Sequence, residues 1–236
     1  MPILLAAIAA SAALITVIGI AIGPHSREAL FAVDRERSEV ELNLSPGAQR
    51  TEVYDSNGKE IGILRYDIDR ELITISQVPD DVMGTLLAVE DNKFWTHNGV
   101  DIRAISRAMI QNLTSGAITQ GGSTITQQIV KLRIVGNESS LSRKIREAVL
   151  AARLEEEFSK EQILEFYLNE IYFGNGAYGL QAAAETYFGK DVDQLDVGDA
   201  ALLAGLIRSP GIFDGFGDVE IVGKRRSMSL QSAEAA

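Results

Sequence analysis

The chain opens with an uninterrupted apolar stretch before its sequence becomes mixed. Residues 2–23 carry no charged side chain, and about 20 consecutive apolar residues allow a helix to cross a bilayer. We therefore expect a transmembrane anchor over residues 1–23. Two alternatives stay open. A buried core helix would normally show a polar face, and a cleaved signal peptide would normally be shorter and begin with positive charge.

Residues 24–50 are polar and of mixed charge, and they end in the turn-forming sequence Ser45-Pro46-Gly47. This composition predicts a juxtamembrane linker. Two short strand-like runs follow, at 51–54 and 60–65, and Asn57-Gly58 lies between them. Asn-Gly supplies the positive φ angles of a tight turn, so the pattern predicts a β-hairpin.

After Pro79 the spacing of apolar positions becomes helical. Asp80 is a candidate cap for a helix ending at Val89, and Asp101 for one ending at Leu113. Ser159 and Gln162 have the spacing of a capping box, and a further helix is expected after Asp196. The Gly-, Ser- and Thr-rich segment 112–121 joins two of these helices, so we expect it to be a mobile lid.

Composition narrows the function classes. Of 236 residues, 46% are hydrophobic and 23% charged, as in a folded domain, and the formal net charge is −11. That charge argues against general nucleic-acid binding, which depends on surplus Lys and Arg. There is no cysteine, and His25 and His97 are the two histidines. Carboxylates are therefore the leading candidates for acid–base chemistry.

Three segments carry such candidates. Glu90-Asp91 ends an apolar helix and precedes Phe94 and Trp95; apolar walls raise a carboxylate pKa toward neutrality, although an exposed helix-end acid is the plainer interpretation. In residues 121–133, a Gly-Gly pair precedes Ser123 and Thr124, so a helix N-terminus could attract an anion there. The following positions share one face of that helix at three- and four-residue spacings: Thr124, Gln127, Gln128 and Lys131.

The third segment is 141–158. Arg143 and Glu147 are four residues apart, on one helix face, and five basic residues between Lys131 and Arg146 accompany one acid, Glu138. These cations could clamp a diphosphate, or they could form ordinary surface ion pairs. Residues 167–189 interleave aromatic and small residues, which predicts tight helix packing.

In this order the segments resemble family 51 glycosyltransferases, the peptidoglycan polymerase domain of class A penicillin-binding proteins and of monofunctional transglycosylases. The resemblance covers about residues 50–210. It rests on five motifs, EDNKFWTHNGVD, GGSTITQQIVK, RKIRE, ILEFYLNEIYFGNGAYGLQAAA and ALLAGLIRSP, at 90–101, 121–131, 143–147, 163–184 and 201–210.

The resemblance implies a mainly α, lysozyme-like domain of two lobes that polymerises lipid II and releases undecaprenyl diphosphate. It implies that Glu90 is the general base and Glu147 the second catalytic glutamate. Diphosphate contacts are implied for Lys131, Arg143 and Lys144. The remaining implied substrate-contacting or shaping positions are Asp91, Phe94, His97, Ser123, Thr124, Gln127 and Gln128.

The predicted organisation is an anchor (1–23), a linker (24–50), the glycosyltransferase domain (51–210) and a divergent C-terminal tail (211–236), for which truncation is an alternative. Lys224-Arg225-Arg226 in that tail is similar to part of the family's basic helix. Because the tail departs from the family, a catalytically inactive membrane-anchored remnant or binding module is an alternative. A lysozyme-like hydrolase is another, because paired carboxylates also serve hydrolysis, but it needs no diphosphate clamp.

The resemblance also implies surroundings. The catalytic domain is expected outside the cytoplasmic membrane on a single-pass anchor, although Arg27, Arg35 and Arg37 after the apolar stretch favour the opposite orientation by charge alone. The expected partners are lipid II, the growing lipid-linked strand, the membrane and cell-wall synthesis proteins, with no nucleic acid. No cofactor is required and no protein metal site is expected, while a divalent cation at the substrate diphosphate stays open.

Overall fold

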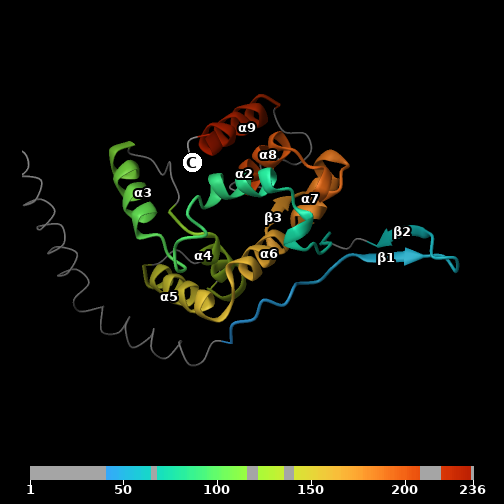
Figure 1. Ribbon diagram of the computed structural model, residues 1–236, viewed down its shortest axis with the longest axis horizontal. Helices are drawn as coiled ribbons and strands as arrows, with labels where there is room; N and C mark the ends of the chain where they lie inside the picture. The colour runs from blue at the N-terminus through green and yellow to red at the C-terminus, as the bar shows by residue number, and fades with distance from the viewer. Residues whose placement is uncertain (1–40, 65–67, 116–121, 136–140, 208–218, 235–236) are drawn as a thin grey trace, which may run out of the picture.

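A computed structural model describes residues 41–64, 68–115, 122–135, 141–207 and 219–234 (Figure 1). The predicted anchor at 1–23 and the linker up to residue 40 lie outside these ranges. Within the described ranges, no helix has the length and apolar character needed to cross a membrane. The described chain is mainly helical, as the sequence predicts.

The predicted β-hairpin is present at one end of the molecule (Figure 1). β1 (Thr51–Tyr54) pairs antiparallel with β2 (Glu60–Leu64). The Asp55 carboxylate accepts the N–H groups of Asn57 and Lys59 at 2.8 and 2.9 Å, and Gly58 takes a φ of +79°. The turn therefore forms from the residues that predicted it.

The other elements are helices and one further hairpin. In chain order these are η1 (Ile75–Gln77), α2 (Asp80–Glu90), α3 (Ile102–Ser115), α4 (Ile125–Val130), η2 (Lys131–Val135), α5 (Leu141–Glu157), α6 (Lys160–Glu170), β3 (Tyr172–Gly174), β4 (Ala177–Tyr178), α7 (Leu180–Phe188), η3 (Val192–Gln194), α8 (Val197–Ile207) and α9 (Val219–Glu234).

Three of the four predicted helix starts are confirmed, including that of α8, which begins directly after Asp196. Asp101 accepts the N–H groups of Arg103 and Ala104 at 2.8 and 3.0 Å at the start of α3. Ser159 forms a capping box with Gln162 before α6. The prediction for Asp80 is wrong, because Pro79 occupies the N-cap position and Asp80 is the first helical residue. There its charge still favours the helix dipole.

The core contains one helix that is apolar nearly all round. α8 packs against both α2 and α9, and these three helices lie together in Figure 1. Leu203 and Ala204 of α8 are completely buried. α9 lies within the segment that the sequence set apart as a divergent tail, and Arg226 of α9 donates to the carbonyl of Gly198 at 3.2 Å. Much of that tail is therefore an ordinary packed helix.

Residues 167–189 pack tightly, as predicted, but they also contain a short hairpin that the sequence did not reveal. β3 and β4 pair antiparallel around a turn in which Gly174, Asn175 and Gly176 all have positive φ. Strands this short leave no alternating pattern to recognise. Gly179 also has positive φ, and a Cβ there would lie 2.8 Å from the carbonyl oxygen of Asn169. The hairpin is thereby held close against α6.

The expected lid lies mostly outside the described residues. α3 continues to Ser115, so residues 112–115 are helical, and residues 116–121 are not described. Gly122, where description resumes, lies close to α3: a Cβ there would be 2.9 Å from the Cα of Ile105. The mobility of the 112–121 segment stays a prediction.

Candidate functional site

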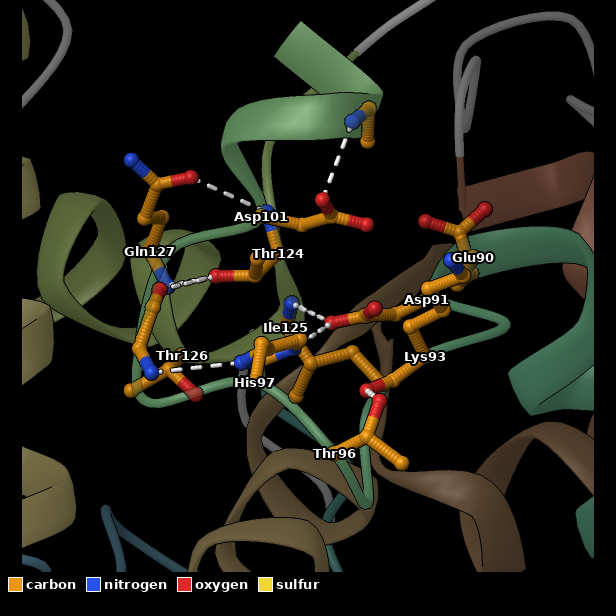
Figure 2. Close-up of polar contacts among 12 residues, drawn as sticks. Glu90, Asp91, Lys93, Thr96, His97, Asp101, Thr124, Ile125, Thr126 and Gln127 are labelled. Atoms are coloured by element: carbon orange, nitrogen blue, oxygen red, sulfur yellow. Dashed lines mark hydrogen bonds and ion pairs between the residues drawn. The ribbon is translucent and has the colours of Figure 1, made fainter.

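Glu90 and Asp91 are consecutive residues whose side chains turn to different sides (Figure 2). Glu90 is the last residue of α2, and Asp91 leaves the helix with an extended backbone, φ −159° and ψ 77°. Glu90 is half-buried, and its carboxylate accepts a hydrogen bond from Nε2 of Gln128 at 3.0 Å. Gln128 is on α4, so the end of α2 is joined to α4 through this amide.

The Asp91 carboxylate points toward the first turn of α4 (Figure 2). Its Oδ2 atom accepts the backbone N–H of Ile125 and the Nε2–H of His97, both at 2.9 Å. A negative charge at this position also stabilises the helix dipole. The sequence predicted that this helix N-terminus would attract an anion; in the structure a protein carboxylate, that of Asp91, occupies the place.

His97 is the centre of a buried polar cluster. Its Nδ1 atom accepts from the Gly99 N–H at 3.2 Å and from Nζ of Lys160 at 3.3 Å. Because Nδ1 accepts, Nε2 carries the proton that is donated to Asp91. Lys160 also contacts both oxygens of Glu155, at 2.8 and 2.7 Å. The cluster therefore pairs Lys160 with Glu155 and gives the Asp91 carboxylate two hydrogen-bond donors.

The same cluster encloses Phe94, which is 1% exposed. Nζ of Lys160 lies 4.5 Å from the centre of the Phe94 ring, a cation–π contact. Trp95 and His97 meet the same ring edge-on. Phe94 thus helps to hold the loop after Glu90, and its ring is not presented to solvent.

Thr124 and Gln127 close the start of α4. They form a reciprocal capping box, with Gln127 N–H donating to Thr124 Oγ1 at 3.1 Å and Thr124 N–H donating to Gln127 Oε1 at 3.0 Å (Figure 2). Thr124 Oγ1 also donates to the carbonyl of Gly99 at 2.6 Å. Both side chains are at least 97% buried. They shape the helix start instead of lining an open face.

Gly99 explains why this loop can approach α5 so closely. Its φ is +84°, and a Cβ at this position would lie 2.6 Å from the backbone of Ala151. A side chain would therefore be strained and would also collide with α5. The glycine lets the loop after Glu90 pack between the α4 start and α5.

Glu147 is the second predicted catalytic glutamate, and its residue is 0% exposed. It pairs with Arg143, four residues earlier as predicted, and with Lys144 Nζ at 2.6 Å. Lys144 also donates to Oγ of Ser123 at 3.1 Å. The segment before α4 and the basic face of α5 are therefore in direct contact, and they carry two cations beside one buried carboxylate.

Lys131 follows α4 directly, and its backbone N–H bonds to the carbonyls of Gln127 and Gln128. It is half-buried, and across the described ranges its Nζ has no hydrogen bond or ion pair. Arg133, two residues on, instead donates to Ser45 O and to Glu170 at 2.7 and 3.3 Å. The predicted basic run is therefore not one patch, because Arg133 is directed to the linker.

Sequence reasoning missed three residues of this site: Glu155, Lys160 and Tyr167. Lys160 lies 63 residues from its partner His97, and Tyr167 lies 39 residues from Gln128, to which its hydroxyl donates at 3.2 Å. The local signals were a capping box and an apolar helix face, which predict a helix but not these contacts. Within the described residues, no group of three or more His, Asp and Glu side chains could hold a metal ion.

The chain is similar in sequence to known proteins. Residues 57–234 match the family model described as "Transglycosylase". Penicillin-binding protein 1A of Aquifex aeolicus is 45% identical over 78% of this chain and 25% of its own length. Penicillin-binding protein 1F of Bacillus subtilis is 39% identical over 69% of this chain and 23% of its own length. Penicillin-binding protein 1A of Pseudomonas aeruginosa is 43% identical over 69% of this chain and 20% of its own length.

The chain thus spans a quarter or less of the length of these relatives. The family match nevertheless includes Glu90, α4, Glu147 and also α9 in the segment set apart as a tail. The resemblance that the five motifs predict is confirmed, and this chain belongs to the transglycosylase family.

Proposed function

We propose that this chain is a peptidoglycan glycosyltransferase that joins lipid II units into glycan strands, with Glu90 as the general base. The observation that carries the proposal is the different use of two adjacent carboxylates. Asp91 is held by Ile125 and His97, whereas Glu90 turns away from that cluster and accepts from Gln128. A half-buried carboxylate at the edge of a rigid loop suits proton transfer.

The proposed reaction consists of one proton transfer and one displacement. A Glu90 oxygen takes the proton of the 4-hydroxyl on the acceptor N-acetylglucosamine, and the 4-oxygen of that sugar attacks the anomeric carbon of the donor. The new glycosidic C–O bond forms as the bond from this carbon to the diphosphate breaks. Undecaprenyl diphosphate leaves with the electron pair of the broken bond.

Charge on the leaving diphosphate requires cations. Lys131, Arg143 and Lys144 are the proposed contacts, because positive groups fixed where negative charge develops lower the barrier most. Glu147 holds Arg143 and Lys144 on the face of α5 next to Ser123. This basic group favours transfer from a diphosphate over hydrolysis of a glycan, which has no such leaving group.

The surroundings of the enzyme are part of the proposal. We place the catalytic domain outside the cytoplasmic membrane, on an anchor at residues 1–23, where it would meet lipid II, the growing strand and other cell-wall synthesis proteins. The proposed catalytic domain begins near residue 51, and α9, which packs against α8 beyond the expected boundary at 210, belongs to it. We propose that no cofactor is required and that any divalent cation is bound by the substrate diphosphate.

The experiment is polymerisation of fluorescent lipid II by the full chain in detergent, followed on gels that resolve glycan strands. The matched variant is Glu90→Gln, which keeps the side chain's shape and removes the base. We expect strands from the wild type and none from Glu90→Gln. A folded wild-type protein that makes no strands would contradict the proposal and favour a remnant that only binds partners.

A further inference from the structure

Three side chains from three helices form a continuous chain of hydrogen bonds that ends at Glu90. The hydroxyl of Tyr167 on α6 donates to Oε1 of Gln128 at 3.2 Å. The Nε2 group of the same amide donates to Oε2 of Glu90 at 3.0 Å. Tyr167 is 2% exposed, so this hydroxyl reaches the site from inside the core.

The two ends of a glutamine amide have opposite chemistry. The NH₂ end donates to a carboxylate and stabilises its ionised form, whereas the carbonyl end would repel it. A donor fixed at the carbonyl end, such as the Tyr167 hydroxyl, therefore favours the orientation in which the NH₂ end faces Glu90. A general base must be ionised to accept a proton.

We propose that Tyr167 is a positioning residue for the glycosyl transfer, acting on Glu90 through the amide of Gln128. This inference rests on the proposed function of Glu90. Tyr167 is not proposed to touch substrate or reacting atoms, and its effect on Glu90 passes through the Gln128 side chain. Its role is to keep the Gln128 amide turned with its NH₂ group toward the carboxylate.

A second buried tyrosine provides a matched control. The hydroxyl of Tyr187 donates to the carbonyl of Phe173 at 2.8 Å, in a contact that involves no proposed catalytic residue. Tyr167→Phe and Tyr187→Phe each remove one hydroxyl and keep the ring. A merely structural role for Tyr167 would make the two variants alike in kinetics as well as in stability.

The test is the pH–rate profile of lipid II polymerisation for wild type, Tyr167→Phe, Tyr187→Phe, Gln128→Met and the double variant Tyr167→Phe/Gln128→Met. We expect Tyr167→Phe to lower kcat about tenfold, with KM within about twofold, as the loss of one well-placed hydrogen bond can do. The acid limb of its profile should move to higher pH. Tyr187→Phe should leave kcat and the acid limb unchanged.

The double variant distinguishes a path through Gln128 from a direct structural effect. Tyr167→Phe should add nothing once Gln128 is methionine, because contacts in one network are not additive. If the two effects add, or if Tyr167→Phe has the kinetics of the wild type, the inference is wrong while the proposed function stands.

An activity-independent measurement separates the two failures. The titration midpoint of Glu90 can be followed by the ¹³C resonance of its carboxyl carbon in the wild type and in Tyr167→Phe. If the wild type makes no strands but the Glu90 midpoint still rises in Tyr167→Phe, the contact is supported and the proposed function is rejected. An unchanged midpoint would overturn the inference whatever the activity.

Discussion

The loop that carries Asp91 and the helix end that carries Glu90 show how neighbouring residues acquire different uses. Asp91, His97, Glu155 and Lys160 contact one another in a buried cluster, in which each has at least one of the others as a partner. Glu90, one residue away, contacts α4 through a neutral amide. Asp91 is fixed inside the cluster by two donors, whereas the half-buried Glu90 carboxylate lies at the edge of that cluster, where a substrate hydroxyl could meet it.

A substitution of Glu147 is the strictest test of this comparison, because Glu147 is buried like Asp91 but lies among the proposed diphosphate contacts. Glu147→Gln leaves Arg143 and Lys144 without their carboxylate. We expect a loss of about 3–5 kcal/mol in the free energy of unfolding, the usual result of breaking a buried ion pair, together with loss of polymerisation. Urea unfolding and the lipid II assay measure the two effects.

The matched control lies on the same helix. Arg153 and Glu157 form an ion pair with the same four-residue spacing, but it is more exposed. Glu157→Gln should change the free energy of unfolding by less than about 1 kcal/mol and leave polymerisation intact. Equal effects for the two glutamates would remove the special position given to Glu147.

Replacing Lys131 should lower the rate of polymerisation without changing the stability of the fold. Lys131→Ala removes a cation that has no hydrogen bond or ion pair across the described ranges. We expect kcat/KM to fall about 100-fold, as when one electrostatic contact to the transition state is removed, and the unfolding midpoint to stay unchanged. Lys131→Arg, which keeps the charge, should recover part of the activity; wild-type turnover in Lys131→Ala would exclude a diphosphate contact.

Replacing Asp91, in contrast, should lower the stability of the fold. Asp91→Ala leaves the Ile125 N–H and the His97 Nε2–H without their acceptor, so we expect the free energy of unfolding to fall by about 1–3 kcal/mol. Asp91→Asn keeps one acceptor oxygen and should fall between wild type and alanine. Full stability in Asp91→Ala, measured by urea unfolding, would show that the cluster is not a scaffold.

The smallest predicted effect concerns the cap of α3. Burial would raise the pKa of Asp101, but the N–H groups of Ala104 and Arg103 outweigh it and hold the pKa below its ordinary 3.8. Asp101→Ala should therefore cost about 1 kcal/mol of folding free energy at neutral pH. Because the folded-state pKa is depressed, this contribution is complete above the unfolded pKa and is lost as pH falls through the folded one.

Urea unfolding across pH checks this prediction. The difference between wild type and Asp101→Ala should shrink below about pH 4, where the unfolded carboxylate takes up its proton. Asp101→Asn, which caps without titrating, serves as the control. A difference that stays constant down to pH 2 would contradict the role of the ionised carboxylate.

The sequence was most informative where structure depends on neighbours along the chain. The Asn57-Gly58 hairpin, the Asp101 cap, the Ser159 capping box and the Arg143–Glu147 pair all involve residues at most a few positions apart. Local hydrogen bonds and helix spacing determine such features. Family motifs added the expected roles of Glu90 and Glu147, which no local rule could assign.

The rest depended on contacts between distant segments. No periodicity places Lys160 against His97 or Tyr167 against Gln128, because these contacts arise where α6 packs on the loop after Glu90 and on α4. Asp91 likewise comes from a distant segment, 34 residues before Ile125, and occupies the helix N-terminus where an external anion was expected. Arg133 was misplaced for a similar reason, since Glu170 lies 37 residues along the chain from it.

The most direct test of the division between Glu90 and Asp91 is one set of measurements on Glu90→Gln: lipid II affinity, single-turnover polymerisation and urea unfolding. We predict that turnover falls by about 10²–10⁴-fold, the usual contribution of a general base, while affinity stays within about twofold and the unfolding midpoint does not move. Parallel loss of affinity and turnover, or turnover at the wild-type rate, would contradict the assignment of Glu90 as the base.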